Sequence, residues 1–211
     1  MLQSGLMRLS GGLALAAALG LAAPAAADSL KVGYSVRIIG LNIGTAGLIA
    51  ELDPGRYELE VSAKLGGVAA IVTRSESAAK STGGLAEGRV VPASYATTTS
   101  NSKETRTVRM ALNGGSVRAV DINPPFDEHP SRVPVTEQHK RNILDPLSAL
   151  LMPVAGSGPV LGPPACERSI PVFDGFTRFD VNLSYVGRRE VAGPGYRGQV
   201  VVCAARYRPV A

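Results

Sequence analysis

The chain has 211 residues, of which 22 are basic and 17 acidic, so its formal net charge at pH 7 is +5. This mild charge is typical of an ordinary solvated surface, and with no Trp, six Tyr and four Phe it argues against a nucleic-acid-binding protein. The length suits one domain with a real core and is short for two.

Residues 1–27 have the features of a secretory signal peptide. Arg8 supplies the positive start, residues 9–23 form an apolar run, and the alanines at 25–27 suit a signal-peptidase site. Glycines interrupt the apolar run, and it is shorter than the ~20 residues of a membrane span, which favours cleavage over an uncleaved anchor. Cleavage leaves 184 of the 211 residues, 28–211, as a single β-rich domain that we expect to be soluble in the periplasm.

The mature chain opens with three predicted strands. Apolar and polar side chains alternate strictly over residues 30–38, the pattern of a half-buried antiparallel strand. A second segment, punctuated by glycines, covers 43–52, and a third alternating segment covers 57–65. Pro54-Gly55 between them suits a tight turn. Three strands with short connections predict a β-meander.

The next segment, residues 66–84, favours a strand over a short helix because Thr and Ser are frequent in it. Its glycines, Gly83 and Gly84, and the nearby Gly88 could suggest a phosphate-binding loop. The lysine and helix start that such a loop needs are absent. We therefore predict that these glycines lie in turns.

Three further strands are predicted over residues 90–100, 105–112 and 117–122. Residues 123–134 contain four prolines and charges of both signs, so they form a loop that cannot join a sheet interior.

A metal site is a weak alternative for this region. Glu128, His129 and His139 lack the fixed spacing of a metal-ligand set. We therefore expect no metal and no other cofactor.

One helix is predicted after this loop. Asp145 can cap the free amides of a first helical turn, Pro146 suits the first helical position, and Pro153 ends the element. The segment between them is short and apolar, with Leu150 and Leu151 at its end. We expect it to pack against the sheet, as part of the core or as the plug of a cavity.

The last part of the chain is predicted to be a strand hairpin. Asp174-Gly175 suits a tight turn, and apolar residues alternate with polar ones over 177–185. Cys166 precedes this unit and Cys203 ends it, 37 residues later. In an exported protein this spacing favours a structural disulfide over a redox pair. Such a disulfide would stabilise the fold by about 4 kcal/mol on the chain-entropy model.

Motifs along the chain also carry a family resemblance. In chain order they are Gly88-Arg89-Val90-Val91-Pro92, Asp145-Pro146-Leu147-Ser148-Ala149-Leu150 within 142–153, Val172-Phe173-Asp174-Gly175-Phe176-Thr177-Arg178-Phe179-Asp180, Cys203, and Tyr207-Arg208-Pro209-Val210-Ala211. Together they resemble the bacterial domain-of-unknown-function family 3108 (DUF3108) over most of residues 29–211. The resemblance implies an exported envelope protein with a curved antiparallel sheet, similar in style to the open half-barrels of lipoprotein carriers. It brings no catalytic residue.

The chain departs from the family pattern at its end. Related chains generally continue with a basic and apolar stretch after Pro-Val-Ala, whereas this one stops at Ala211. A missing closing strand would leave an exposed sheet edge or an incomplete cavity.

We therefore predict a mainly β fold: a curved antiparallel sheet or open half-barrel with one short packed helix. The function that suits it best is a non-catalytic module that binds a lipid, an acyl chain or another hydrophobic ligand. The residues expected to line such a site are Tyr34, Val36, Leu59, Val61, Leu150, Leu151, Phe179, Val181 and Leu183. The same residues would also suit a filled core.

Two other functions stay open. A protein of cell-envelope biogenesis could offer a sheet edge or the loop 124–134 to a partner protein. A hydrolase could use His129 or His139 with a serine and either Asp127 or Asp145. No nucleophile elbow is found, and Asp145 is explained as a helix cap, so we predict that the protein is not an enzyme.

Overall fold

The computed structural model describes residues 28–67, 75–127, 130, 132–153, 161–193 and 196–211. These residues form two antiparallel sheets and three short 3-10 helices. The mainly β fold and the antiparallel pairing are thereby confirmed, and neither sheet closes into a barrel. The predicted signal peptide, residues 1–27, lies outside the described residues and stays a prediction.

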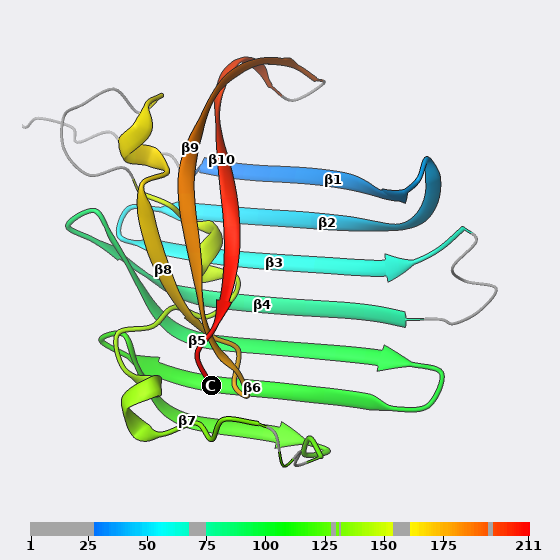
Figure 1. Cartoon of the computed structure of the whole chain (residues 1–211), viewed down its shortest axis with the longest axis vertical. Helices are drawn as coiled ribbons and strands as arrows, with labels where there is room; N and C mark the ends of the chain where they lie inside the picture. The colour runs from blue at the N-terminus through cyan, green and yellow to red at the C-terminus, as the bar shows by residue number, and fades with distance from the viewer. Residues whose placement is uncertain (1–27, 68–74, 128–129, 131, 154–160, 194–195) are drawn as a thin grey trace, which may run out of the picture.

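The large sheet is a seven-stranded meander in which each strand pairs with the next (Figure 1). Its strands are β1 (Asp28–Ile38), β2 (Leu41–Asp53), β3 (Arg56–Leu65), β4 (Ser75–Ala86), β5 (Arg89–Asn101), β6 (Thr105–Asn113) and β7 (Ser116–Asn123). The predicted meander is confirmed. Gly55 takes a φ of 80° in the β2–β3 turn, a conformation that glycine adopts without steric cost.

The prediction that the three clustered glycines lie in turns is wrong for two of them. Gly83 and Gly84 lie inside β4, and only Gly88, with a φ of 70°, lies in a turn. Gly83 is needed for space rather than for its dihedral angles. A Cβ atom at this position would lie 2.5 Å from the hydroxyl of Tyr57 and would also collide with the carbonyl oxygen of Val91.

The small sheet has the order β10-β9-β8 and crosses the large sheet (Figure 1). Its strands are β8 (Arg168–Phe173), β9 (Arg178–Ala192) and β10 (Arg197–Pro209). The Asp174-Gly175 turn joins β8 to β9, and Cys166 is bonded to Cys203 with a Cα–Cα distance of 5.5 Å, so both predictions are confirmed. The prediction of a single curved sheet is wrong, because β8, β9 and β10 form a separate sheet.

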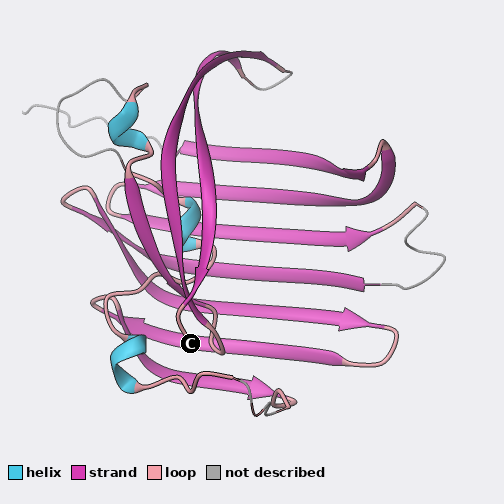
Figure 2. Cartoon of the chain, viewed as in Figure 1, coloured by secondary structure: helices cyan, strands magenta, loops and turns pink. Residues whose placement is uncertain are grey.

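The predicted helix after Asp145 is not present as such. Residues 145–153 contain only a 3-10 turn, η2 (Ser148–Leu150), and Leu151 is already extended (Figure 2). Asp145 does cap this turn, because its Oδ1 accepts bonds from the amides of Leu147 and Ser148, both at 3.0 Å. Pro153 disfavours helical geometry in the residue before it, which leaves too few residues for a stable α-helix. The other 3-10 turns are η1 (Glu137–Lys140) and η3 (Pro163–Ala165).

The core lies between the two layers, near the end of the large sheet where β3 begins. It combines residues of the sheet with residues of the segments that cover it: Ala50, Tyr57, Leu59, Tyr95, Met110 and Leu112 from the sheet, and Ile143, Leu147 and Phe173 from the cover. No residue of β9 or β10 is fully buried. The small sheet therefore contributes to the core mainly through β8.

Replacing Gly83 by Ala should lower the free energy of unfolding by about 1–3 kcal/mol, because the added methyl group must displace Tyr57 or the β5 backbone. The neighbouring Gly84→Ala variant is the matched control, since its Cβ atom would meet nothing closer than 3.6 Å. Urea unfolding of both variants measures the difference. Equal stabilities would show that the tight space at Gly83 is not a constraint.

Candidate functional site

The register of the large sheet places alternate residues of every strand on the face that meets the cover, here called the inner face. Three rows of paired residues cross it. The core row is Leu30, Ala50, Leu59, Ser81, Tyr95 and Met110; the middle row is Val32, Leu48, Val61, Ala79, Thr97 and Val108; the open row is Tyr34, Ala46, Ala63, Ser77, Thr99 and Arg106.

Along β3, burial decreases from the core row to the open row. Leu59 in the core row is 1% exposed, Val61 in the middle row is half-buried, and Ala63 in the open row is exposed. Tyr34, at the β1 end of the open row, is 51% exposed. The inner face therefore continues without a break from the packed core into an uncovered apolar surface.

The residues predicted to line a ligand site divide between different places. Tyr34, Val36, Leu59 and Val61 share the inner face, but Leu59 is sealed in the core. Leu150 is 53% exposed at the end of the η2 turn. Leu151 is half-buried and packs against the core. The other three, Phe179, Val181 and Leu183, are half-buried residues of β9 in the small sheet, where Phe179 packs against Tyr207.

Strand β1 is more exposed than its alternation predicts. Every residue of β1 except Val32 is exposed, although the strand was expected to be half-buried. Alternation shows which side chains share a face, and it carries no information about what covers that face. β1 is an edge strand of the large sheet, and its apolar side chains lie in the part of the inner face where burial is lowest.

The opposite, outer face of the large sheet is polar. Lys80 pairs there with Glu58 and Glu60, and Lys64 pairs with Glu76 at 2.7 Å. A hollow of about 700 Å³ is lined by the two outer-face rows that begin at Lys31 and Gly33, and by the middle-row residues between them, Val32, Leu48, Val61, Ala79 and Thr97. Although it is large, its charged rim suits an apolar ligand poorly.

A fully buried polar cluster anchors the η2 turn to the inner face. The carboxylate of Asp145 accepts hydrogen bonds from the hydroxyls of Ser81 (3.0 Å) and Ser148, besides the two amides that it caps. Tyr57 Oη lies 2.5 Å from Ser148 Oγ. Because the one proton of Ser148 Oγ goes to the carboxylate, Tyr57 donates in this pair.

Burial shifts the pKa of the acidic groups in this cluster. Desolvation raises the pKa of Asp145 above its ordinary value of 3.8, and the hydrogen bonds from Ser148 and Ser81 oppose part of the shift. Desolvation also raises the pKa of Tyr57. It raises the pKa of the neighbouring Tyr95 to about 12, with a smaller contribution from the charge of Asp145.

The cluster holds the two layers together and offers no surface to a substrate. Ser81, Asp145 and Ser148 are each 0% exposed. His139, which was considered with Asp145 in a hydrolase, lies in η1, where its Nδ1 accepts a bond from the amide of Thr136. His129 and Glu128 lie outside the described residues. The prediction that the protein is not an enzyme stays a prediction.

Comparison with protein families identifies the chain. The model of the family described as "Protein of unknown function (DUF3108)" matches residues 33–210. The protein belongs to the DUF3108 family. Comparisons with curated proteins and with solved structures gave no match. Within the described ranges of this DUF3108 protein, no helix has the length and apolar character that crossing a bilayer requires.

Removing the carboxylate should weaken the contact between the layers. Asp145→Ala leaves two buried hydroxyls and two amides without their acceptor, so we expect a loss of about 3 kcal/mol in the free energy of unfolding. Asp145→Asn keeps the shape of the side chain and an oxygen acceptor, so its loss should be smaller. Urea unfolding at neutral pH compares the two variants.

Comparison of the parent with Asp145→Asn also tests the raised pKa of Asp145. A carboxyl whose pKa is higher in the folded than in the unfolded protein stabilises the fold at low pH, and this contribution is lost as pH rises through the folded pKa. The free energy of unfolding of the parent, measured relative to Asp145→Asn, should therefore fall as pH rises above about 4. A difference that does not change with pH would contradict the shift.

Proposed function

We propose that the protein is a non-catalytic periplasmic module that binds a lipid or another hydrophobic ligand on the open part of the inner face. The observation that carries the proposal is the composition of the middle and open rows. From β1 to β5 neither row contains a charged residue, whereas the outer face of the same strands carries ion pairs.

The dimensions of the open face suit an extended chain. At about 4.8 Å between neighbouring strands, a row that crosses β1–β5 is roughly 19 Å long. A ligand lying along it would cover Tyr34 and Val61 and would gain about 0.8 kcal/mol for each CH₂ group that it buries. The periplasmic location rests on the predicted signal peptide and is consistent with the Cys166–Cys203 disulfide.

The filled core limits where such a ligand can lie. Leu147 belongs to the segment expected to be part of the core or the plug of a cavity; it is 6% exposed and packs with Tyr57 and Leu59. A ligand between η2 and the sheet would therefore have to displace core side chains. The middle and open rows require no such change.

A protein partner is the second candidate, and one observation favours it. Among the described strands β1 pairs only with β2, and apolar side chains are concentrated on it and on the turn that follows, including Ile38 at 57% and Ile39 at 98% exposed. An edge strand with an apolar face can accept a strand from another protein. In that case the protein would act as an interaction factor in envelope biogenesis.

Ala63→Glu tests the proposal by placing a charge in the open row at an exposed position. Lysophosphatidylcholine, a single-chain lipid without net charge, should displace the neutral probe N-phenyl-1-naphthylamine from the parent protein. We expect Ala63→Glu to weaken this binding by about tenfold or more, because the carboxylate would lose water on contact with the chain. Probe fluorescence during titration measures the affinity.

Ser62→Glu is the matched control, because Ser62 is the neighbouring exposed residue and lies on the outer face. Its affinity for the lipid should equal that of the parent. No lipid binding by the parent, or equal losses in the two variants, would contradict the proposal. Crosslinking of β1 to another envelope protein in cells, without lipid binding, would support the second candidate instead.

A further inference from the structure

A separate hollow lies beside β7 and the β8–β9 turn, with a volume of about 440 Å³. We call it the Arg132 pocket. Its apolar walls are Val120, Val135, Phe173 and Phe176, and its charged residues are Arg132 and Lys140. None of its described lining residues is acidic. It therefore combines positive charge with apolar surface, unlike the β1–β5 part of the middle and open rows, which carries no charge.

The wall formed by Phe176 is set by the β8–β9 turn. Oδ1 of Asp174 accepts bonds from the amides of Phe176 (2.8 Å) and Thr177 (2.6 Å), which fixes the turn. Gly175 has a φ of 101°, and a Cβ atom there would collide with Val108 of β6. The turn is thus pressed against the large sheet and holds Phe176 at the pocket.

The guanidinium of Arg132 is held in place but is not fully bonded. It lies over the ring of Phe176, 3.1 Å from the centroid, and its Nη2 donates to the carbonyl oxygen of Phe176. Its Nη1 is buried and has no hydrogen-bond partner within the described part of the chain. A buried charged donor without an acceptor is costly, and an anion in the pocket would supply the acceptor.

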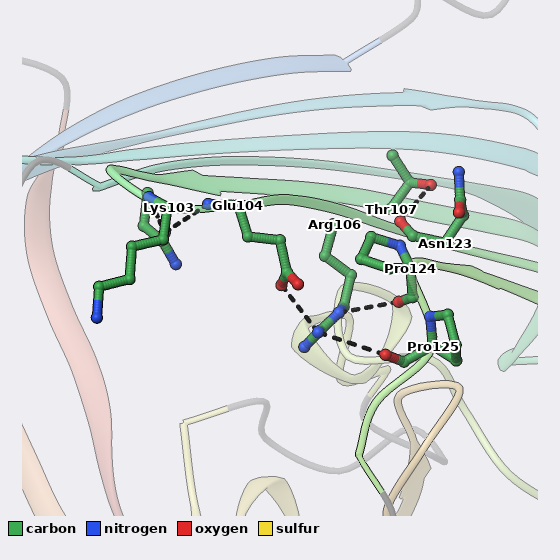
Figure 3. Close-up of polar contacts among 8 residues, drawn as sticks. Lys103, Glu104, Arg106, Thr107, Asn123, Pro124 and Pro125 are labelled. Atoms are coloured by element: carbon green, nitrogen blue, oxygen red, sulfur yellow. Dashed lines mark hydrogen bonds and ion pairs between the residues drawn. The ribbon is translucent and has the colours of Figure 1, made fainter.

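The neighbouring arginine shows what a compensated site looks like. Phe126 stacks on Phe176 at 4.1 Å, and Arg106 lies over Phe126 at 4.0 Å. Arg106 is bonded to the carboxylate of Glu104 at 2.8 Å and to the carbonyl of Pro124 at 3.0 Å (Figure 3). Each phenylalanine of the stack thus carries an arginine, and only Arg106 has a carboxylate partner among the described residues.

Lys140 contributes a positive charge that is already paired with a carboxylate. Its Nζ is 2.7 Å from the carboxylate of Glu137, which is 79% exposed, and this pair lowers the pKa of Glu137. Arg132 is therefore the primary donor to an anion.

We infer that the Arg132 pocket binds an organic anion, a carboxylate or phosphate group attached to an apolar body. The anionic group bonds to the guanidinium of Arg132, and the apolar body lies against Val120, Val135 and Phe173. The volume falls in the range of small-molecule sites. This site is independent of ligand binding on the inner face, because none of its lining residues belongs to the middle or open row.

Three probes with the same ten-carbon chain test the inference: decanoate, decyl phosphate and neutral decyl glucoside, titrated calorimetrically below their micelle concentrations at constant ionic strength. The parent should bind one or both anions and bind the glucoside at least about tenfold more weakly. Carboxylate and phosphate affinities show which head group the pocket prefers. Equal affinity for the anions and the glucoside would overturn the inference.

Arg132→Gln should weaken anion binding by about tenfold or more, because it removes the charged donor. Arg118→Gln is the charge-matched control, since Arg118 is an exposed residue of β7 outside the lining, and its affinity should stay within about twofold of the parent. Equal losses in the two variants would show that only net charge matters and would overturn the site.

Two further variants keep the test decisive. Val135→Phe fills the pocket while Arg132 is kept, and it should also weaken anion binding. It therefore tests the site even if Arg132→Gln perturbs folding. Ala63→Glu, on the open row, should leave anion binding unchanged. If Ala63→Glu weakens decanoate binding and Val135→Phe does not, the anion lies on the inner face and the Arg132 pocket is not its site.

Discussion

One buried carboxylate joins the two layers of this protein. Asp145 caps the η2 turn through two backbone amides and bonds to Ser81 in the middle of the large sheet. A buried charge is tolerated only where donors surround it, and here the hydroxyls of Ser81 and Ser148 add to the two amides. The cluster also restricts position 83 of β4 to glycine, because a Cβ atom there would occupy the space of the Tyr57 hydroxyl.

The position of this anchor explains why the large sheet is only partly covered. The core forms where Asp145, Leu147 and Phe173 meet β3, β4 and β6, at one end of the strands. The small sheet is held there by β8, while the disulfide ties β10 to the segment before β8, and β9 and β10 bury no residue completely. The rest of the inner face therefore keeps an apolar surface without a described cover.

The two proposed sites differ in what they recognise. The middle and open rows around Val61 and Ala63 present no charge from β1 to β5, so they suit the apolar part of a ligand or partner. In the Arg132 pocket the guanidinium is held against Phe176 and its Nη1 has no partner among the described residues, so the pocket suits an anionic group. The two sites share no lining residue, so each can exist without the other.

Alternation, turn chemistry and cysteine spacing determined much of this fold from the sequence. They gave the meander, the inner-face positions of Tyr34 and Val61, the Asp174-Gly175 turn and the disulfide, because each depends on neighbours in the chain or on a single pair. Only the tertiary structure decided that β8–β10 form a second sheet and that β1 is exposed. It also brought Phe126, Phe176 and Arg132 together, since packing between distant segments leaves no periodic signal in the sequence.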